Sequence, residues 1–353
     1  VETKHSNKEI KKTTNFDENG ICDACNWSKI KKREINWNKR EKELIQLLNY
    51  HRSKKGNYDV VVPTSGGKDS IYVAHILKYK YKMNPLTVTW PPILYTDYGK
   101  KNFDNWLSVG GFDNITLKPN PKVQKILTKL SIEKLLHPFQ TFILGQKNLA
   151  PKIAKQHNIN LVFFGENEAE YGNPISDNLN SVRDKSYYTY QNIKDVYLAG
   201  TKVSELISRY KINLSDLSLY LPLKLDDYKT KDLQIHYLGY YLKWVPQEAY
   251  YYAVDNTSFK ARPHRTEGTY SKYNSIDDKI DDLHHYTRFI KFGIGRATDD
   301  ASQEIRNNHI NREEAKRLVK RFDGEFPQRY FEEIMDYLEI KPKNFLKLCD
   351  KFR

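Results

Sequence analysis

Residues 58–70 read YDVVVPTSGGKDS and combine a short apolar run with a glycine-rich turn. The apolar run, residues 58–62, is typical of a buried strand. Residues 70–79 carry apolar side chains at helical spacing and predict a helix. Between them, Gly66 and Gly67 allow the backbone to approach a ligand closely, and the helix N-terminus offers N–H groups and a partial positive charge. The stretch therefore predicts a phosphate-binding turn.

The polar residues of this turn distinguish it from the commonest phosphate loop. Ser65 and Ser70 supply hydroxyls, Lys68 supplies a cation, and Asp69 is expected to hold Mg²⁺ on the phosphates. The Walker A motif requires G-x-x-x-x-G-K-[ST], but here Asp69 follows the Gly-Lys pair and Val62 stands where the first glycine would be. The stretch instead resembles the S-G-G-x-D-S loop of the PP-loop ATP pyrophosphatases, which cut ATP between the α- and β-phosphates. A purely structural Gly-Gly turn is the alternative. The resemblance implies ATP contacts from Thr64, Ser65, Gly66, Gly67, Lys68, Asp69, Ser70 and Gly165.

Strand-like and helix-like stretches alternate along the first half of the chain. Strands are predicted at 58–62, 86–90, 114–117 and 161–164, and helices at 38–51, 70–79, 101–109, 123–136 and 139–157, the last with a break near Gly145 or Pro151. This order predicts an α/β fold with a parallel sheet covered by helices on both faces, and ligands at the carboxyl ends of the strands. The resemblance adds that the sheet is Rossmann-like, of the adenine nucleotide alpha hydrolase type.

Three regions are expected in the 353 residues. Residues 1–35 form a polar, irregular N-terminal segment with a C-x-x-C motif, and residues 36–245 form the PP-loop domain. Residues 246–353 are expected to be mainly helical, with helices at 302–322 and 327–340.

Composition limits the cellular setting. With 39% hydrophobic and 29% charged residues, the chain is not a wholly disordered one. Neither a run of about 18 apolar residues nor a signal-peptide pattern occurs, and three cysteines cannot form a disulfide framework, so a cytoplasmic protein without a membrane span is expected. The net charge of +14 attracts anions such as nucleic acid, nucleotides or an acidic partner, but a solvated lysine-rich surface is the simpler explanation, so composition alone does not choose a partner.

Nearly the whole chain resembles the N-acetyl sugar amidotransferase family, PP-loop enzymes of bacterial surface-polysaccharide and nonulosonic-acid biosynthesis. The resembling stretches are 16–25 (FDENGICDAC), 58–70, 84–90 (NPLTVTW), Thr96, Gly99 and Asn102 at T-x-x-G-x-x-N spacing, 164–172 (FGENEAEYG), 238–244 (LGYYLKW), 267–270 (EGTY), 275–298, 312–315 (REEA) and 322–327 (FDGEFP). The block from 238 onward is specific to this family within the superfamily.

The resemblance implies an ATP-dependent amidotransferase. Its substrate is a nucleotide-linked N-acetyl amino sugar, whose acetamido group becomes an acetamidino group, with ammonia from a glutaminase subunit and release of AMP and pyrophosphate. The chemistry suits the phosphate loop, because an amide oxygen leaves only after it is adenylated, and the protein must align three reactants and neutralise phosphate charge.

Candidate site residues follow from the motifs and their positions. The catalytic candidates are Lys68, Asp69, Glu166 and Glu170. Glu166 and Glu170 follow a predicted strand, where a carboxylate can hold Mg²⁺, orient the amide or accept a proton from ammonia; helix-capping acids are the alternative. The substrate-binding candidates are Asn167, Trp244, Lys291 and Arg296, with ordinary surface charge as the alternative for the two cations.

An acidic run precedes a pair of histidines. Asp277, Asp278, Asp281 and Asp282 are candidates for binding sugar hydroxyls or metal, and a solvated helix face is the alternative. His284 and His285 are adjacent, so on a helix at most one of them faces a given site.

Cys22 and Cys25 form a C-x-x-C pair that supplies two of the four ligands of a structural zinc site. The resemblance implies a second C-x-x-C immediately upstream, so we expect it before Val1 and zinc with it; Glu2 and His5 are weak substitutes. Cys349, in an apolar helical context, is expected to pack as a small apolar residue.

Two other functions remain open at the level of sequence. A tRNA-modifying PP-loop enzyme of the thiolase or lysidine type would share the loop and explain the positive charge, but thiolases need further cysteines, so nucleic acid is the less favoured partner. A non-catalytic scaffold that docks a glutaminase would not need the intact loop of residues 65–70. The sequence leaves homo-oligomerisation open.

Overall fold

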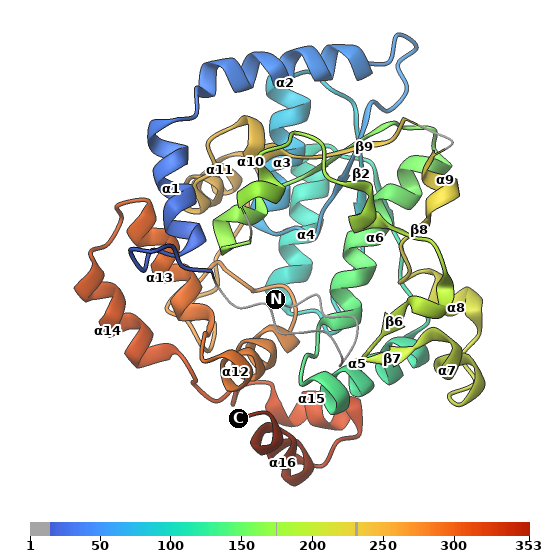
Figure 1. Ribbon diagram of the computed structural model, residues 1–353, viewed down its shortest axis with the longest axis vertical. Helices are drawn as coiled ribbons and strands as arrows, with labels where there is room; N and C mark the ends of the chain where they lie inside the picture. Colours follow the sequence, from blue (N-terminus) through green and yellow to red (C-terminus); the bar gives the residue numbers. More distant parts are fainter. Residues whose placement is uncertain (1–14, 174, 230–231) are drawn as a thin grey trace.

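The computed structural model describes residues 15–173, 175–229 and 232–353. Its centre is a five-stranded, fully parallel sheet in the order β3-β2-β1-β4-β9 (Figure 1). These strands are β1 (Val60–Pro63), β2 (Pro85–Thr89), β3 (Asn114–Thr116), β4 (Leu161–Phe164) and β9 (Gln234–Tyr237). Short strand pairs lie outside the sheet: β5 (Thr189–Tyr190) with β8 (Leu223–Lys224), and β6 (Tyr197–Leu198) with β7 (Thr201–Lys202).

Helices cover both faces of the sheet, as the alternating sequence predicts (Figure 1). The long helices are α1 (Asp23–Arg33), α2 (Trp37–His51), α3 (Lys68–His75), α4 (Asp97–Gly110), α5 (Pro121–Leu135), α6 (Gln140–Gln156), α11 (Pro246–Thr257), α12 (Ile280–Phe292), α13 (Arg296–Arg306), α14 (Arg312–Phe322), α15 (Phe331–Leu338) and α16 (Pro342–Phe352). The short ones are α7 (Val203–Ser208), α8 (Leu214–Ser218), α9 (Leu225–Lys229) and α10 (Leu238–Tyr241). Among the described residues, no helix is both long and apolar enough to cross a membrane.

Alternate residues of the central strands build two separate cores. Val61 of β1 and Val162 of β4 lie in one core, with apolar side chains of α5, α6, α12, α15 and α16. Val60, Val62 and Phe163 lie in the other, with side chains of α2, α3, α4 and α11. Strands buried on both faces are apolar throughout, which explains the continuous runs in the sequence.

The strand order reverses between β1 and β4, which places a crevice at their carboxyl ends. β1 leads directly into the glycine-rich turn at Ser65, and β4 leads into Gly165 and Glu166. The two stretches that the sequence marks as functional therefore end at the same point of the sheet.

Three element boundaries differ from the sequence-based expectation. The segment around Cys25 is helical, in α1, rather than irregular. Helix α6 runs unbroken through Pro151. The predicted helix 302–322 is divided into α13 and α14, because Asn311 and Glu314 form a reciprocal capping box that begins a new helix. The three-region division of the chain stays a prediction.

Candidate active site

The glycine-rich turn is a tight backbone cradle between β1 and α3. Gly66 has φ +83°, and a Cβ there would lie 2.7 Å from the Cα of Phe103 in α4. No side chain fits this position, so glycine is required both for conformation and for space. Gly67 is the N-cap of α3, so the first N–H groups of that helix point out of the turn.

Polar side chains stabilise the turn from within. The Ser70 hydroxyl donates to the Gly67 carbonyl at 3.0 Å and accepts from the Ser65 N–H at 3.3 Å. The Lys68 ammonium is buried and lies 2.7 Å from both carboxylate oxygens of Asp69, whose side chain is about one-third exposed. In the absence of an anion the lysine charge is thus balanced by its neighbour, and its cation stays close to the helix N-terminus.

Glu166 and Tyr171 face this loop from the end of β4. The Tyr171 hydroxyl donates to Glu166 Oε1 at 2.9 Å. Burial raises the pKa of Glu166, and the negative charge of Asp69 raises it further. Tyr171 keeps 51% of its surface accessible, yet desolvation by the surrounding protein raises its pKa well above the usual value.

The acidic run packs against the start of α4 and contacts the glycine-rich turn. Gly99, in the first turn of α4, touches the backbone of Asp277 so closely that a Cβ on Gly99 would lie 2.4 Å from the Asp277 Cα. Burial raises the pKa of the Asp277 carboxyl, and hydrogen bonding with the Ser65 side chain opposes the rise. Burial also raises the pKa of Asp281 well above its usual value, Asp277 adds to the effect, and the charge of Arg296 opposes it. Both side chains are half-buried.

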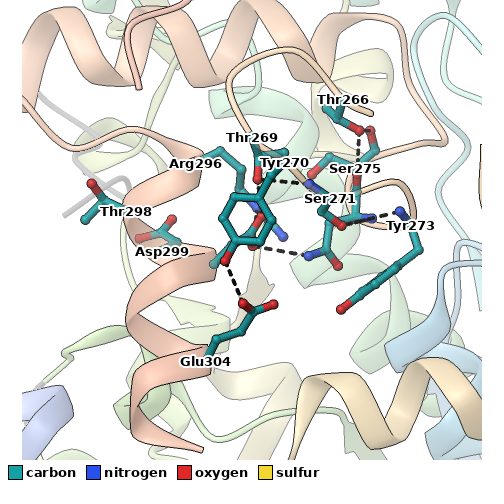
Figure 2. Close-up of polar contacts among 12 residues, drawn as sticks. Thr266, Thr269, Tyr270, Ser271, Tyr273, Ser275, Arg296, Thr298, Asp299 and Glu304 are labelled. Atoms are coloured by element: carbon teal, nitrogen blue, oxygen red, sulfur yellow. Dashed lines mark hydrogen bonds and ion pairs between the residues drawn. The ribbon is translucent and has the colours of Figure 1, made fainter. Parts of the chain in front are cut away.

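Arg296 is fixed by a polar network that joins α13 to the loop 266–275 (Figure 2). Its Nε lies 2.9 Å from Asp300 Oδ1, and the Thr269 hydroxyl donates to Asp300 Oδ2 at 2.6 Å. The Tyr270 hydroxyl donates to Glu304 at 2.9 Å. The EGTY motif of the sequence therefore holds α13 in place and, through Asp300, orients the guanidinium of Arg296.

We call the resulting group the carboxyl-edge site. It consists of Ser65–Ser70, Glu166, Tyr171, Asp277, Asp281 and Arg296. The site fits a polyphosphate, because it combines the backbone cradle at Gly66 that a Cβ would fill, the N-terminus of α3 and the Lys68 ammonium. Asp69 is exposed enough to bind a hydrated Mg²⁺ on that polyphosphate. Among the described residues, no group of three or more His, Cys, Asp or Glu side chains could hold a metal ion without such a ligand.

Several candidates from the sequence make contacts outside the group of side chains named above. Glu170 is buried against α1, where its Oε1 lies 2.7 Å from Lys31 Nζ and accepts from Trp27 Nε1 at 3.0 Å. Trp244 is buried, and its carbonyl accepts from Lys31. Four further candidates have structural contacts. Asn167 caps a short 3₁₀ turn by accepting from the Ala169 N–H, and Thr64 shares a 3.3 Å hydrogen bond with Thr89. Lys291 donates to the Leu135 carbonyl, and Gly165 packs beside Trp244.

The four aspartates of the acidic run divide into two pairs. Asp277 and Asp281 belong to the carboxyl-edge site. Asp278 is buried and accepts from the backbone N–H groups of Ile93, Leu94 and Ile280, so it joins the start of α12 to the loop after β2. Asp282 is buried, with its Oδ2 3.9 Å from Arg329. Of the two histidines, His285 is buried and the half-buried His284 stacks on His137.

The cysteines do not provide a complete metal site. Cys22 is the N-cap of α1, Cys25 lies one turn into the helix, and both are half-buried. Burial raises the pKa of Cys25, and hydrogen bonding with Cys22 adds to it. Two thiols alone do not fit a four-ligand zinc site, and zinc is not supported within the described residues; Glu2 and His5 lie outside them. Cys349 of α16 is 1% exposed, and burial raises its pKa to about 11.

Sequence analysis missed one residue of the carboxyl-edge site and under-weighted two others. Tyr171 lies within the stretch 164–172 that resembles the amidotransferase family, and an aromatic hydroxyl five residues after Glu166 was the available signal. Asp277 and Asp281 appeared only as members of an acidic run. Their separation from Asp278 and Asp282 depends on how α12 begins against α4.

The structure confirms the parallel sheet with helices on both faces that the sequence predicts, and its S-G-G-x-D-S loop, which resembles that of the PP-loop ATP pyrophosphatases, lies at the switch point of the sheet. Residues 267–353 match the family described as "LPS biosynthesis protein WbpG-like, C-terminal domain". This match confirms the resemblance that the late sequence block carries. It includes the EGTY motif, the acidic run and Arg296.

Individual proteins resemble the chain more distantly. A curated relative, the uncharacterized protein MJ1599 of Methanocaldococcus jannaschii, is 36% identical over 84 residues, which are 24% of this chain and only 29% of that protein. The U34-tRNA thiolase NcsA of Methanococcus maripaludis, solved with its [4Fe-4S] cluster, is 11% identical with a TM-score of 0.36 and covers 96% of this chain and 91% of its own.

Two synthetases are similar in the same limited way. The NH3-dependent NAD synthetase of Campylobacter jejuni, in complex with nitrate, is 13% identical with a TM-score of 0.34 and covers 89% of this chain and 96% of its own. The NMN synthetase of Francisella tularensis is 18% identical with a TM-score of 0.28 and covers 39% of this chain and 58% of its own. With TM-scores below 0.5, these similarities are too weak to indicate what this chain does.

Proposed function

We propose that the chain is an ATP-using enzyme of lipopolysaccharide or related surface-sugar biosynthesis, and specifically an N-acetyl sugar amidotransferase. The observation that carries the proposal is the S-G-G-x-D-S cradle at the switch point, with Glu166 near Asp69 and with Asp277, from the segment that matches the WbpG-like family, hydrogen-bonded to the Ser65 side chain. In the proposed reaction, an N-acetyl sugar, ATP and ammonia give the acetamidino sugar, AMP and pyrophosphate.

The loop would bind the triphosphate of ATP. The N–H groups at the start of α3 and the Lys68 ammonium would neutralise the β- and γ-phosphates, and Lys68 would exchange part of its contact with Asp69 for phosphate oxygen. Asp69 would then be free to hold Mg²⁺. Attack of the amide oxygen on the α-phosphorus breaks the bond to the β-phosphate, so pyrophosphate leaves and the amide becomes adenylated.

Glu166 is the proposed base for the second half-reaction. Ammonia adds to the adenylated carbon as a neutral molecule and becomes positively charged, so it must lose a proton before AMP leaves with the former amide oxygen. A carboxylate with a raised pKa, close to that nitrogen, accepts the proton efficiently near neutral pH. The hydrogen bond from Tyr171 would keep Oε1 oriented and leave Oε2 for the nucleophile.

The decisive assay combines ATP, ammonium and a panel of nucleotide-linked N-acetyl amino sugars. We expect AMP and pyrophosphate in equal amounts and a product that is about one dalton lighter than the substrate and more basic. With ¹⁸O in the acetyl carbonyl, the label should appear in AMP, since the mechanism transfers that oxygen to the α-phosphorus. Release of ADP and phosphate, or unlabelled AMP with amidine formation, would contradict the proposed mechanism.

Ammonia is proposed to come from a separate glutaminase subunit. The thiol of Cys349 is buried in the core, and its pKa is raised, which is the opposite of an activated nucleophile. The purified chain should form amidine from ammonium at mildly alkaline pH and be nearly inert with glutamine. Robust glutamine use that is lost in Cys349→Ser would overturn this assignment.

The net charge of +14 keeps tRNA modification as a second candidate. That function predicts a tRNA complex whose affinity falls steeply with added salt. Cys22 and Cys25 are the cysteines outside the core, and they lie on α1 rather than in the carboxyl-edge site. Tight, salt-sensitive tRNA binding together with no amidine from any sugar would favour this candidate over the amidotransferase.

A further inference from the structure

A desolvated lysine lies beside the carboxyl-edge site without a hydrogen-bonded partner among the described residues. The Lys147 Nζ of α6 lies 4.5 Å from the centroid of the Tyr187 ring and 5.3 Å from that of Tyr188. Burial lowers its pKa to about 8, so the ammonium is still mostly charged at pH 7. Ring faces compensate only part of the lost hydration of an ammonium, and its three N–H donors remain available.

The carboxylate of Glu168, whose charge raises the pKa of Lys147, is already used by other groups. Glu168 Oε1 accepts from the Tyr237 hydroxyl at 3.0 Å, and Glu168 Oε2 forms a close ion pair with Arg183 Nη2. Arg183 also stacks over the Tyr187 ring, 3.7 Å from its centroid. Glu168 is therefore engaged by Arg183 and Tyr237, and no described carboxylate contacts Lys147 directly.

The surroundings hold these groups rigidly. Phe164, the last residue of β4, stacks on both Tyr188 and Tyr237, whose hydroxyls lie 3.1 Å apart. The group, which we call the Lys147 cluster, consists of Lys147, Glu168, Arg183, Tyr187, Tyr188 and Tyr237. A rigid, positively charged and partly desolvated group of this kind is suited to binding an oxyanion.

The cluster borders the segment that carries the proposed base. Glu166 turns toward Tyr171 and Asp69, whereas Glu168, two residues later, turns toward Tyr237 and Arg183. The Lys147 cluster and the phosphate loop therefore flank the same short segment after β4. A molecule whose acetamido group reached Glu166 from this side would bring its other groups over Lys147.

We propose that the Lys147 cluster binds an oxyanion of the acceptor substrate, with Lys147 as its direct ligand. The inference rests on the proposed amidotransferase function and adds how the sugar is held. Phosphate oxygens of a nucleotide carrier and the carboxylate of a nonulosonic acid offer the same chemistry to the ammonium. A charge-assisted hydrogen bond of this kind is expected to strengthen binding about ten-fold or more.

The test measures binding in the absence of ATP and ammonia. UDP, CMP and N-acetylneuraminate serve as probes in calorimetric titrations of the full chain. In Lys147→Met we expect affinity for at least one probe to fall about ten-fold, with ATP affinity unchanged, and Lys147→Arg to retain binding within about three-fold. Lys155→Met on the same helix is the matched control, because Lys155 lies 2.9 Å from Asp227 and away from the cluster. Loss for UDP or CMP identifies the carrier phosphate, and loss for N-acetylneuraminate identifies the carboxylate.

Two results would overturn the inference: binding of none of the probes by the wild type, or equal affinities of wild type and Lys147→Met. Thermal unfolding identifies a variant that fails to fold, and Lys147→Gln then replaces Lys147→Met. Because the readout is binding, failure to form amidine would contradict the proposed function without changing this result, and amidine formation with unaltered probe affinity would contradict the inference alone.

Discussion

The two edges of the central sheet differ in how well their buried acidic side chains are compensated. At the amino edge, a cavity of about 850 Å³ is lined mostly by neutral polar residues, including Tyr50, His51 and Asn158. Its buried acid, Asp59, is fully used, since its carboxylate accepts from the backbone N–H groups of Ser53 and Asn84. At the carboxyl edge, by contrast, burial raises the pKa values of the acidic side chains of the carboxyl-edge site.

We infer from this difference that uncompensated buried charge indicates the candidate site better than cavity volume does. Asp59 stabilises the turn before β1 and is chemically satisfied. Glu166, Asp277 and Asp281 all have raised pKa values for which burial is the main cause, so protein has been built around carboxyls that would be more stable in water. Such an arrangement costs stability and is expected where a ligand or a proton is handled.

The largest expected effect concerns the buried ion pair of Lys31 and Glu170. Glu170 follows β4, as Glu166 does, but its charge and that of Lys31 compensate each other. Glu170→Gln leaves the Lys31 ammonium buried without its counter-charge and should lower the free energy of unfolding by about 3–5 kcal/mol. Because Glu170 faces α1, kcat for amidine formation should stay within about three-fold of wild type. Chemical denaturation and steady-state kinetics on the same preparations measure both.

The exposed pair of Lys125 and Glu339 provides the control, since Glu339→Gln should cost less than about 1 kcal/mol. The double variant Lys31→Met, Glu170→Leu removes both buried charges and should recover most of the lost stability. A fall in kcat of about 100-fold in a stable Glu170→Gln protein would restore Glu170 to the catalytic candidates.

The second prediction compares lysines at the two edges. Lys68→Ala removes the cation beside the phosphate cradle and should reduce the rate of pyrophosphate release at least about 100-fold, the scale of one lost preorganised charge contact. Lys185→Ala, at the amino-edge cavity, should change the rate less than two-fold. Equal losses in the two variants would remove the functional distinction between the edges.

The third prediction concerns Glu166. Its raised pKa means that the carboxylate form, and with it the rate, increases as the pH rises through that value. Glu166→Gln should lower kcat about 10- to 30-fold and abolish this rise, whereas Tyr171→Phe should keep the rise but shift it, because the hydrogen bond to Oε1 is lost. A pH profile of kcat that is identical in wild type and Glu166→Gln would rule out Glu166 as the base.

The sequence predicts the elements of the carboxyl edge but not their partners. The loop, the strand before it and the strand ending at Phe164 are local patterns, so periodicity and glycine placement suffice for them. Glu166 and Glu170 look equivalent in the sequence, yet the intervening 3₁₀ turn directs one to the loop and the other to α1.

Local sequence patterns likewise do not predict the contacts of Lys147. Its ring contacts come from residues about forty positions later, after β4, and Glu168 enters from the segment between them. Such contacts are fixed by tertiary packing and not by any pattern within one element. The same holds for Asp282, whose burial follows from the docking of α12.

The smallest predicted effect tests whether Asp282, a buried acid of the acidic run outside the carboxyl-edge site, makes stability depend on pH. Burial raises the pKa of Asp282 to about 7, from an ordinary value of 3.8. Between about pH 4 and 7 the folded state retains a proton that the unfolded state has lost, so stability falls as the pH rises through this window. Asp282→Asn cannot ionise, and from pH 6 to 7.5 its free energy of unfolding should fall by about 1 kcal/mol less than that of wild type. Asp350→Asn, on an exposed side chain of α16, should follow the wild-type curve. Parallel curves for wild type and Asp282→Asn would mean that Arg262 and Arg329 together fully compensate the buried charge, and the contrast between satisfied and unsatisfied acids would then no longer hold at Asp282.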